Sequence, residues 1–192
     1  MSAELTRTLV RDTAHRLFVA NGYGATSVRD VAVAAGVSEE AVHTDFPTKA
    51  ALYREALNAA LAVRPERVTD RAAASAVFTP LRATDIIETT AAGAASLLSR
   101  AGALIMRGIE CAGTDPEMRR IATEGEAAQR ATMKTLASAL IATGSVRPDF
   151  TADEVADILV GLCSPHLHHL LGWPEHRYRY WLASTMKASL LR

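Results

Sequence analysis

Apolar residues recur at helical spacing along most of the chain. Val10, Ala14, Leu17 and Phe18 stand at i, i+4, i+7 and i+8, so they share one face of a helix. The related spacing i, i+3, i+4, i+7 follows at Val28, Val31, Ala32 and Ala35. No run alternates apolar with polar residues over a useful length, as a half-buried strand would. The pattern therefore predicts an all-α protein of about nine helices.

Short capped segments divide the first fifty residues. Gly22 and Gly24 end the first helix, because glycine tolerates the left-handed conformation of a helix stop. Ser27 with an acidic residue three positions later is a capping box, and Ser38 is placed to cap a third helix that Pro47 closes. Two short helices joined by a tight turn that contains Gly36, packed on a longer one, predict a helix-turn-helix.

Longer helices are expected in the remainder, together with one irregular region between Pro65 and Pro80. Proline, glycine and capping residues mark the boundaries of these helices. They predict helices over about 48–60, 84–100, 101–112, 116–143, 151–171 and from Pro174 to the C-terminus. We expect two domains: residues 1–48 as the helix-turn-helix domain, and residues 49–192 as a helical domain.

Composition favours a soluble cytoplasmic protein. Hydrophobic residues make up 49% of the chain, and the longest alanine-rich stretch is interrupted by Arg100, so no membrane span is expected. The first thirty residues lack the apolar segment of a signal peptide. Cys111 and Cys163 stand isolated within helical patterns, which indicates reduced thiols in the cytosol.

The charge balance gives no support to a nucleic-acid partner. The net charge is zero, and the first fifty residues hold five basic and six acidic side chains. A DNA-binding domain usually carries a basic excess. A DNA-binding function must therefore be argued from the helix pattern and not from bulk charge.

Three segments in register resemble the TetR (tetracycline-repressor-like) family of transcriptional regulators. They are the Leu17–Ala32 stretch with its Gly22-Tyr23 turn, Ala35-Gly36-Val37-Ser38, and Phe46-Pro47-Thr48-Lys49. The resemblance covers about the first fifty residues. It implies a homodimer that binds double-stranded DNA, pairs through its last two helices and holds a small-molecule effector between its C-terminal helices. The implied function is a ligand-responsive regulator, most often a repressor released from a near-palindromic operator by a small apolar molecule.

The same resemblance implies a set of DNA-binding residues. Thr26, Ser27 and Lys49 match phosphate-contacting positions. The alternative for Thr26 and Ser27 is simple capping, and both roles can hold together; the alternative for Lys49 is an ordinary solvated lysine. The outer face of the recognition helix carries Ser38, Glu39, Glu40, His43 and Thr44. A glutamate can accept a hydrogen bond from the amino group of cytosine, but acidic residues in a first helical turn also stabilise the helix dipole. Both interpretations of the two glutamates stay open.

The recognition helix also departs from the family pattern. His43 stands where most members have tyrosine, and Asp45 stands where a neutral or basic residue is usual. The helix contains no lysine or arginine. Acidic side chains near phosphates reduce affinity, so we expect binding that is weak, strongly salt-sensitive or dependent on the arginines of the first helix.

The sequence gives fewer indications of the effector site than of the DNA-binding residues. The family arrangement would place five residues around a central cavity: Met106, Glu110, Cys111, Leu162 and His166. Ordinary core packing is the alternative for each of them. His166 and His169 share a helix face, but no carboxylate or cysteine stands at a matching ligand spacing, so we expect no metal and no cofactor.

Two other functions remain as alternatives. A helical dimer that kept the fold but lost DNA binding would act as a protein-interaction module, and the acidic recognition helix is consistent with it. An enzyme is not expected, because no nucleophile, base and orienting group emerge from the spacing. Ser184-Thr185-Met186-Lys187 fits S-x-x-K, but its companion motifs are missing.

Overall fold

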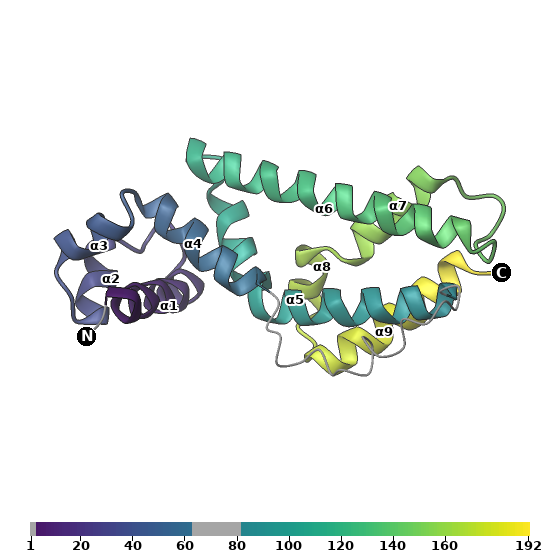
Figure 1. Ribbon diagram of the computed structural model, residues 1–192, viewed down its shortest axis with the longest axis horizontal. Helices are drawn as coiled ribbons and strands as arrows, with labels where there is room; N and C mark the ends of the chain where they lie inside the picture. Colours follow the sequence, from purple (N-terminus) through teal and green to yellow (C-terminus); the bar gives the residue numbers. More distant parts are fainter. Residues whose placement is uncertain (1–2, 63–81) are drawn as a thin grey trace. The chain divides into compact units, whose positions relative to one another are not determined.

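The computed structural model describes residues 3–62 and 82–192, and within them the chain folds into nine helices (Figure 1). The only β-type pairing among these residues is an isolated bridge between Val146 and Leu191. The predicted all-α class is confirmed. The region predicted to be irregular between Pro65 and Pro80 lies outside the described residues. The helices are α1 Ala3–Asn21, α2 Val28–Ala35, α3 Glu39–Asp45, α4 Lys49–Leu61, α5 Ala83–Cys111, α6 Pro116–Ala142, α7 Ala152–Leu162, α8 Pro165–Leu171 and α9 Glu175–Leu190.

Two of the predicted helix boundaries were wrong. The expected break at residue 100 is absent, and α5 continues through Arg100 and Gly102. Nothing there removes a backbone donor, and Leu98, Ala101 and Leu104 continue one buried face. The single helix expected over 151–171 is instead divided. Pro165 cannot donate to the preceding turn, so α7 ends and Ser164 caps α8 with the proline at its start.

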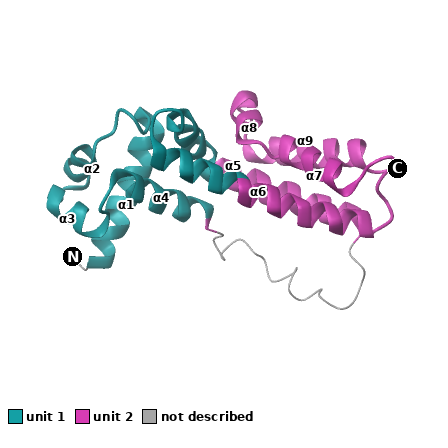
Figure 2. Ribbon diagram, turned by 90° about the horizontal axis from the view of Figure 1, so that it is seen from above, with its two compact units in different colours: residues 1–61, 100–126 teal, residues 62–99, 127–192 magenta. Residues whose placement is uncertain are grey.

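The chain divides into two compact units, shown in different colours in Figure 2. Unit 1 comprises residues 1–61 and 100–126, and unit 2 comprises residues 62–99 and 127–192. Unit 1 therefore holds the helix-turn-helix helices α1 to α3, all of α4, the end of α5 and the beginning of α6. This unit extends beyond the predicted domain 1–48, whose role as a separate functional domain stays a prediction.

Unit 1 is built around one apolar core with an aromatic centre. Phe18 of α1, Tyr23 of the following turn and Tyr53 of α4 form a triangle with ring centroids 5.6 to 5.7 Å apart. Aromatic pairs at such separations add to the stability gained from area burial. The other buried apolar members are Val10, Ala14, Val31, Ala32, Val42, Phe46, Ala50, Leu52, Ala56, Leu104, Met118 and Ile121.

One close approach joins α4 to α5 in this unit. The Tyr53 hydroxyl donates a 2.7 Å hydrogen bond to the backbone carbonyl of Leu104. It can reach that carbonyl because Gly108, one turn later, has no side chain. A Cβ at Gly108 would contact the Tyr53 hydroxyl oxygen and lie 2.9 Å from its Cζ. Burial raises the pKa of Tyr53, which keeps the phenol protonated as a donor.

Unit 2 has a core of its own, formed by α7, α9 and the parts of α5 and α6 that belong to it. Its largest fully buried side chains include Ile87, Leu140, Leu159, Tyr178, Leu182, Met186 and Leu190. Lys187 of α9 forms an ion pair with Glu88 of α5. Of the described helices, none has the length and apolar character needed to cross a membrane.

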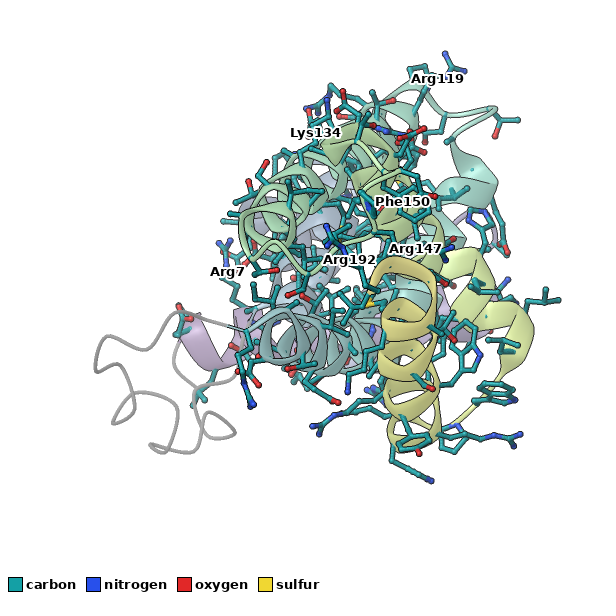
Figure 3. The ribbon with its side chains drawn as sticks, turned by 90° about the vertical axis from the view of Figure 1, so that its right-hand side faces the viewer. Arg7, Arg119, Lys134, Arg147, Phe150 and Arg192 are labelled. Carbon is teal, nitrogen blue, oxygen red and sulfur yellow. The ribbon has the colours of Figure 1, made fainter. Side chains whose placement is uncertain are left out.

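The C-terminal residues of unit 2 are tied to the segment that follows α6. The Arg147 amide donates to the carbonyl of Leu190, and the Arg192 guanidinium donates to the carbonyl of Val146. Arg147, Phe150 and Arg192 are labelled in Figure 3. The Arg147 guanidinium also lies over the Phe150 ring, 5.9 Å from its centroid. These contacts hold the end of α9 in place.

We expect Gly108→Ala to destabilise unit 1, because the added methyl group must displace the Tyr53 ring. Gly125→Ala is a matched control, since Gly125 is also inside a helix of unit 1 but has no atom near its Cβ position. Both substitutions gain helix propensity, and only Gly108→Ala meets a steric obstacle. Urea unfolding should place Gly108→Ala about 1–3 kcal/mol below Gly125→Ala in stability. Equal stabilities would contradict the close approach.

Candidate nucleic-acid interface

Helices α2 and α3 form a helix-turn-helix on the surface of α1. Gly36 ends α2 in the left-handed conformation, with φ of 69°, and its amide donates to carbonyls in the last turn of that helix. An L side chain is strained at such a φ, whereas glycine is not. The buried faces are Val31 and Ala32 of α2 and Val42 of α3. The turn therefore sets the direction of α3 while both helices pack into the core of unit 1.

Ser27 begins α2 through the predicted capping box. Its hydroxyl oxygen accepts a hydrogen bond from the Asp30 amide at 3.0 Å, and the Asp30 carboxylate accepts one from the Ser27 amide at 2.8 Å. The hydrogen bonds from Ser27 lower the pKa of Asp30. Asp30 is therefore a carboxylate at neutral pH and complements the positive end of the α2 dipole.

Helix α3 turns four of the predicted contact residues toward solvent. Glu39, Glu40, His43 and Thr44 are exposed, whereas Val42 between them is buried. Ser38 caps the helix by accepting from the Ala41 amide at 3.1 Å. The structure thus brings the predicted recognition residues together on one outward face.

Two internal contacts occupy groups on that face. The His43 Nε2 lies 3.8 Å from a carboxylate oxygen of Glu39, an ion pair only when the imidazole is protonated. The Thr44 hydroxyl donates to the backbone carbonyl of Glu40 at 2.9 Å. Among the described residues Glu40 forms no ion pair, so its charge is directed toward whatever α3 approaches.

Thr26 and Lys49 are placed differently from an exposed phosphate contact. Thr26 is buried, and its hydroxyl donates to the carbonyl of Gly22 at 2.8 Å, which closes the turn between α1 and α2. Lys49 is half-buried at the start of α4. Its ammonium donates to the carbonyl of Tyr23 at 3.0 Å and lies 4.2 Å from the centroid of the Tyr23 ring. Their roles toward phosphate stay predictions.

The arginines of α1 have partners within the protein. Arg7 lies over the Phe46 ring and 3.7 Å from Glu55, and Arg11 pairs with Asp12 at 2.8 Å. Arg16 donates to the hydroxyl of Thr13. Both ion-paired arginines are thus partly neutralised before any DNA approaches.

The five predicted effector-site residues do not share one compact unit. Met106, Glu110 and Cys111 belong to unit 1, whereas Leu162 and His166 belong to unit 2. Glu110 is exposed and pairs with Arg107, and Cys111 packs against the core of unit 1. Leu162 packs against the core of unit 2, and its carbonyl accepts from the Tyr178 hydroxyl at 2.8 Å. His166 is exposed.

Sequence reasoning missed the residues that hold unit 1 together. The Lys49 ammonium donates to the Tyr23 carbonyl, and the Tyr53 hydroxyl donates to a carbonyl of α5. The Arg107 guanidinium donates to the carbonyl of Val19 at 3.2 Å. Each contact joins positions far apart along the chain, and hydrophobic periodicity carries no information about such pairs. Gly108 offered the one visible signal, since a glycine inside a helix often marks a close approach.

Comparisons with known proteins agree with this geometry. Residues 10–56 match the model of the bacterial regulatory proteins, tetR family. A transcriptional regulator from Saccharomonospora viridis, solved in complex with choline, has 21% identity and a TM-score of 0.73, with 98% of this chain and 99% of that chain covered. A TetR transcriptional regulator from Chloroflexus aurantiacus has 25% identity and a TM-score of 0.68, with 98% of each chain covered.

A third solved structure shares the fold. NalD, the secondary repressor of the MexAB-OprM multidrug efflux pump in Pseudomonas aeruginosa, has 24% identity and a TM-score of 0.69, with 100% of this chain and 99% of that chain covered. No curated protein matches the sequence.

A capped helix-turn-helix with an outward-facing third helix, joined to further helices, defines a DNA-binding transcriptional regulator. Residues 10–56 are similar to the tetR family of bacterial regulatory proteins, and the described helices share the fold of a TetR transcriptional regulator.

The acidic face of α3 leads to a test with Glu39→Gln and Glu40→Gln. Each substitution removes one negative charge from the helix that meets DNA, so affinity for random-sequence duplex at low salt should rise by about two- to fivefold. Glu126→Gln, on an exposed part of α6 in unit 1, is the matched control and should change nothing. Fluorescence anisotropy measures all three.

The same variants separate the two interpretations of the glutamates. A glutamate that reads cytosine should lose operator affinity on substitution even while affinity for random DNA rises. Unchanged affinity for random DNA would show that α3 does not approach the phosphates.

Proposed function

We propose that this protein is a ligand-responsive repressor that leaves a near-palindromic operator when a small apolar molecule binds. The observation that carries the proposal is the capped helix-turn-helix with the exposed α3, within the segment that matches the family model. In such motifs the second helix enters the major groove and the preceding helix crosses the backbone. Helix α3 is accordingly the recognition helix, and it binds double-stranded DNA in the cytoplasm.

The proposed DNA-binding set is the predicted one, with roles adjusted to the geometry. Glu39, Glu40, His43 and Thr44 face the groove, and Lys49 contacts a phosphate. Ser27 and Ser38 begin α2 and α3, where backbone amides are directed toward phosphate groups. Thr26 supports the set by closing the turn before α2.

The effector is proposed to act through α5 and α6. Both helices contribute residues to unit 1 and to unit 2, so a change in either helix reaches the unit that holds the DNA-binding helices. A ligand can shift such an equilibrium only by its differential affinity for the two arrangements, typically ~1–3 kcal/mol. Met106, Glu110 and Cys111 of unit 1 and Leu162 and His166 of unit 2 stay the predicted effector contacts, each within its own unit. The choline complex of the Saccharomonospora viridis protein supports a small organic effector.

The homodimer is proposed to form through α8 and α9. Leu170 and Tyr180 are 81% and 80% exposed, and they are the most exposed large apolar side chains among the described residues. Exposed large apolar side chains are candidates for an interface with a second copy of the chain. A two-fold symmetric dimer would present two copies of α3, one for each half-site of a palindrome.

A protein-interaction module is the second candidate, and the acidic α3 favours it. Its helix carries Glu39, Glu40 and Asp45 with no lysine or arginine. A helix of this charge reduces affinity for DNA. The two functions differ in whether the protein prefers one DNA sequence over another.

The first experiment is an anisotropy titration with DNA from the region upstream of the protein's own gene, at two salt concentrations. We expect saturable binding that weakens as salt rises and exceeds binding to random DNA, because phosphate contacts release counterions and base contacts add specificity. Equal, weak binding to both DNAs, followed by a genomic-fragment selection that enriches no sequence, would favour the interaction module.

The dimer interface is tested by Leu170→Glu combined with Tyr180→Glu. Two charges on each copy would face one another across an isologous interface, so sedimentation velocity at micromolar concentration should change from dimer to monomer. Leu5→Glu, at a 62% exposed leucine of α1, is the control and should leave the dimer intact. A doubly substituted protein that remains dimeric would place the interface on another face.

A further inference from the structure

The ammonium of Lys49 is held by a neutral partner. It donates to the Tyr23 carbonyl at 3.0 Å and lies 4.2 Å above the centre of the Tyr23 ring. Among the described residues no carboxylate forms an ion pair with it. Arg7 and Arg11 of α1, in contrast, are paired with Glu55 and Asp12. Lys49 is therefore immobilised while its charge is left unneutralised.

Tyr23 is itself fixed on all sides. Its side chain is 4% exposed, and its ring packs against Phe18 and stands edge-on to Tyr53. The nearby Asp115 caps α6 by accepting from two backbone amides. Burial and the Asp115 carboxylate raise the pKa of Tyr23, so the phenol stays protonated. The ring cannot turn away from Lys49 without breaking these contacts.

We propose that Tyr23 is a positioning residue for DNA binding: its ring and carbonyl hold the Lys49 ammonium in place for a backbone phosphate. The proposal rests on the proposed DNA-binding function. A lysine ammonium has three donors, and the Tyr23 carbonyl takes one, which leaves two for phosphate oxygens. Holding a long side chain in one geometry before binding reduces the entropy lost when the complex forms.

The choice of an aromatic partner follows from electrostatics. A carboxylate at this position would hold Lys49 equally well but would cancel the charge that attracts phosphate. The face of an aromatic ring attracts a cation through its quadrupole and carries no net charge. Tyr23 thus positions the lysine without competing with DNA.

The test compares phenylalanine and 3,4,5-trifluorophenylalanine at position 23 in the full-length chain. The two side chains have nearly the same shape, but fluorination withdraws electron density from the ring face. Affinity for random-sequence duplex DNA should fall by about three- to tenfold between them, because the cation–π attraction is lost. Random DNA suffices, since phosphate contacts do not depend on sequence. Thermal unfolding should give matching midpoints for the two proteins.

The variant Lys49→Ala tests whether Lys49 contacts a phosphate, through a measured quantity that a purely structural role of Tyr23 would leave unchanged. It should reduce the slope of log affinity against log salt by about 0.9, the value for one phosphate contact. In the Lys49→Ala background, fluorination at position 23 should have no further effect. A fluorination effect that persists there would overturn the proposal, as would equal affinities of the two Tyr23 variants in the presence of Lys49.

The outcomes also separate this proposal from the function on which it rests. Salt-sensitive DNA binding that Lys49→Ala leaves unchanged would reject the positioning role and leave the regulator intact. A wild-type protein that shows no salt-sensitive DNA binding at all would reject the proposed function, and the positioning role with it.

Discussion

The aromatic triangle of Phe18, Tyr23 and Tyr53 is the contact on which unit 1 depends. It joins α1, the turn after it and α4, and the Tyr53 hydroxyl extends it to the backbone of α5. That hydrogen bond is buried and adds to the helix bonding of the Leu104 carbonyl, so a variant that lost it would lose a contribution of about 1 kcal/mol. Because of this contact, the end of α5 belongs to the same compact unit as the DNA-binding helices.

The charged residues around α3 differ in whether a partner of opposite charge neutralises them. The carboxylate of Asp30 is committed to a capping box, and two arginines of α1 are paired with acidic neighbours. Lys49, in contrast, is held by an aromatic ring and a carbonyl. A domain with more acidic than basic residues can thus hold an unneutralised cation at a fixed place beside α3. For phosphate contact, the position of a charge matters as much as the net charge.

The two errors in the predicted helix boundaries have physical causes. A glycine at position 102 weakens a helix only modestly, and the buried face of α5 outweighs that loss. Helical spacing continues on both sides of Pro165, so periodicity alone does not reveal a boundary there. The proline removes a backbone donor, and for that reason a new helix begins at Pro165. One predicted break was absent and one unexpected break was present, so the number of helices agreed although two boundaries did not.

Local information in the sequence determined the helical class, the capping box at Ser27, the turn at Gly36 and the outward face of α3. These features depend on residues within one or two helical turns of each other, so spacing alone predicts them. Only the tertiary structure placed Lys49 on Tyr23, Tyr53 against Leu104, and residues 100–126 in the DNA-binding unit. Those contacts join positions 26 to 51 residues apart, and they form because burial of the aromatic core brings distant segments together.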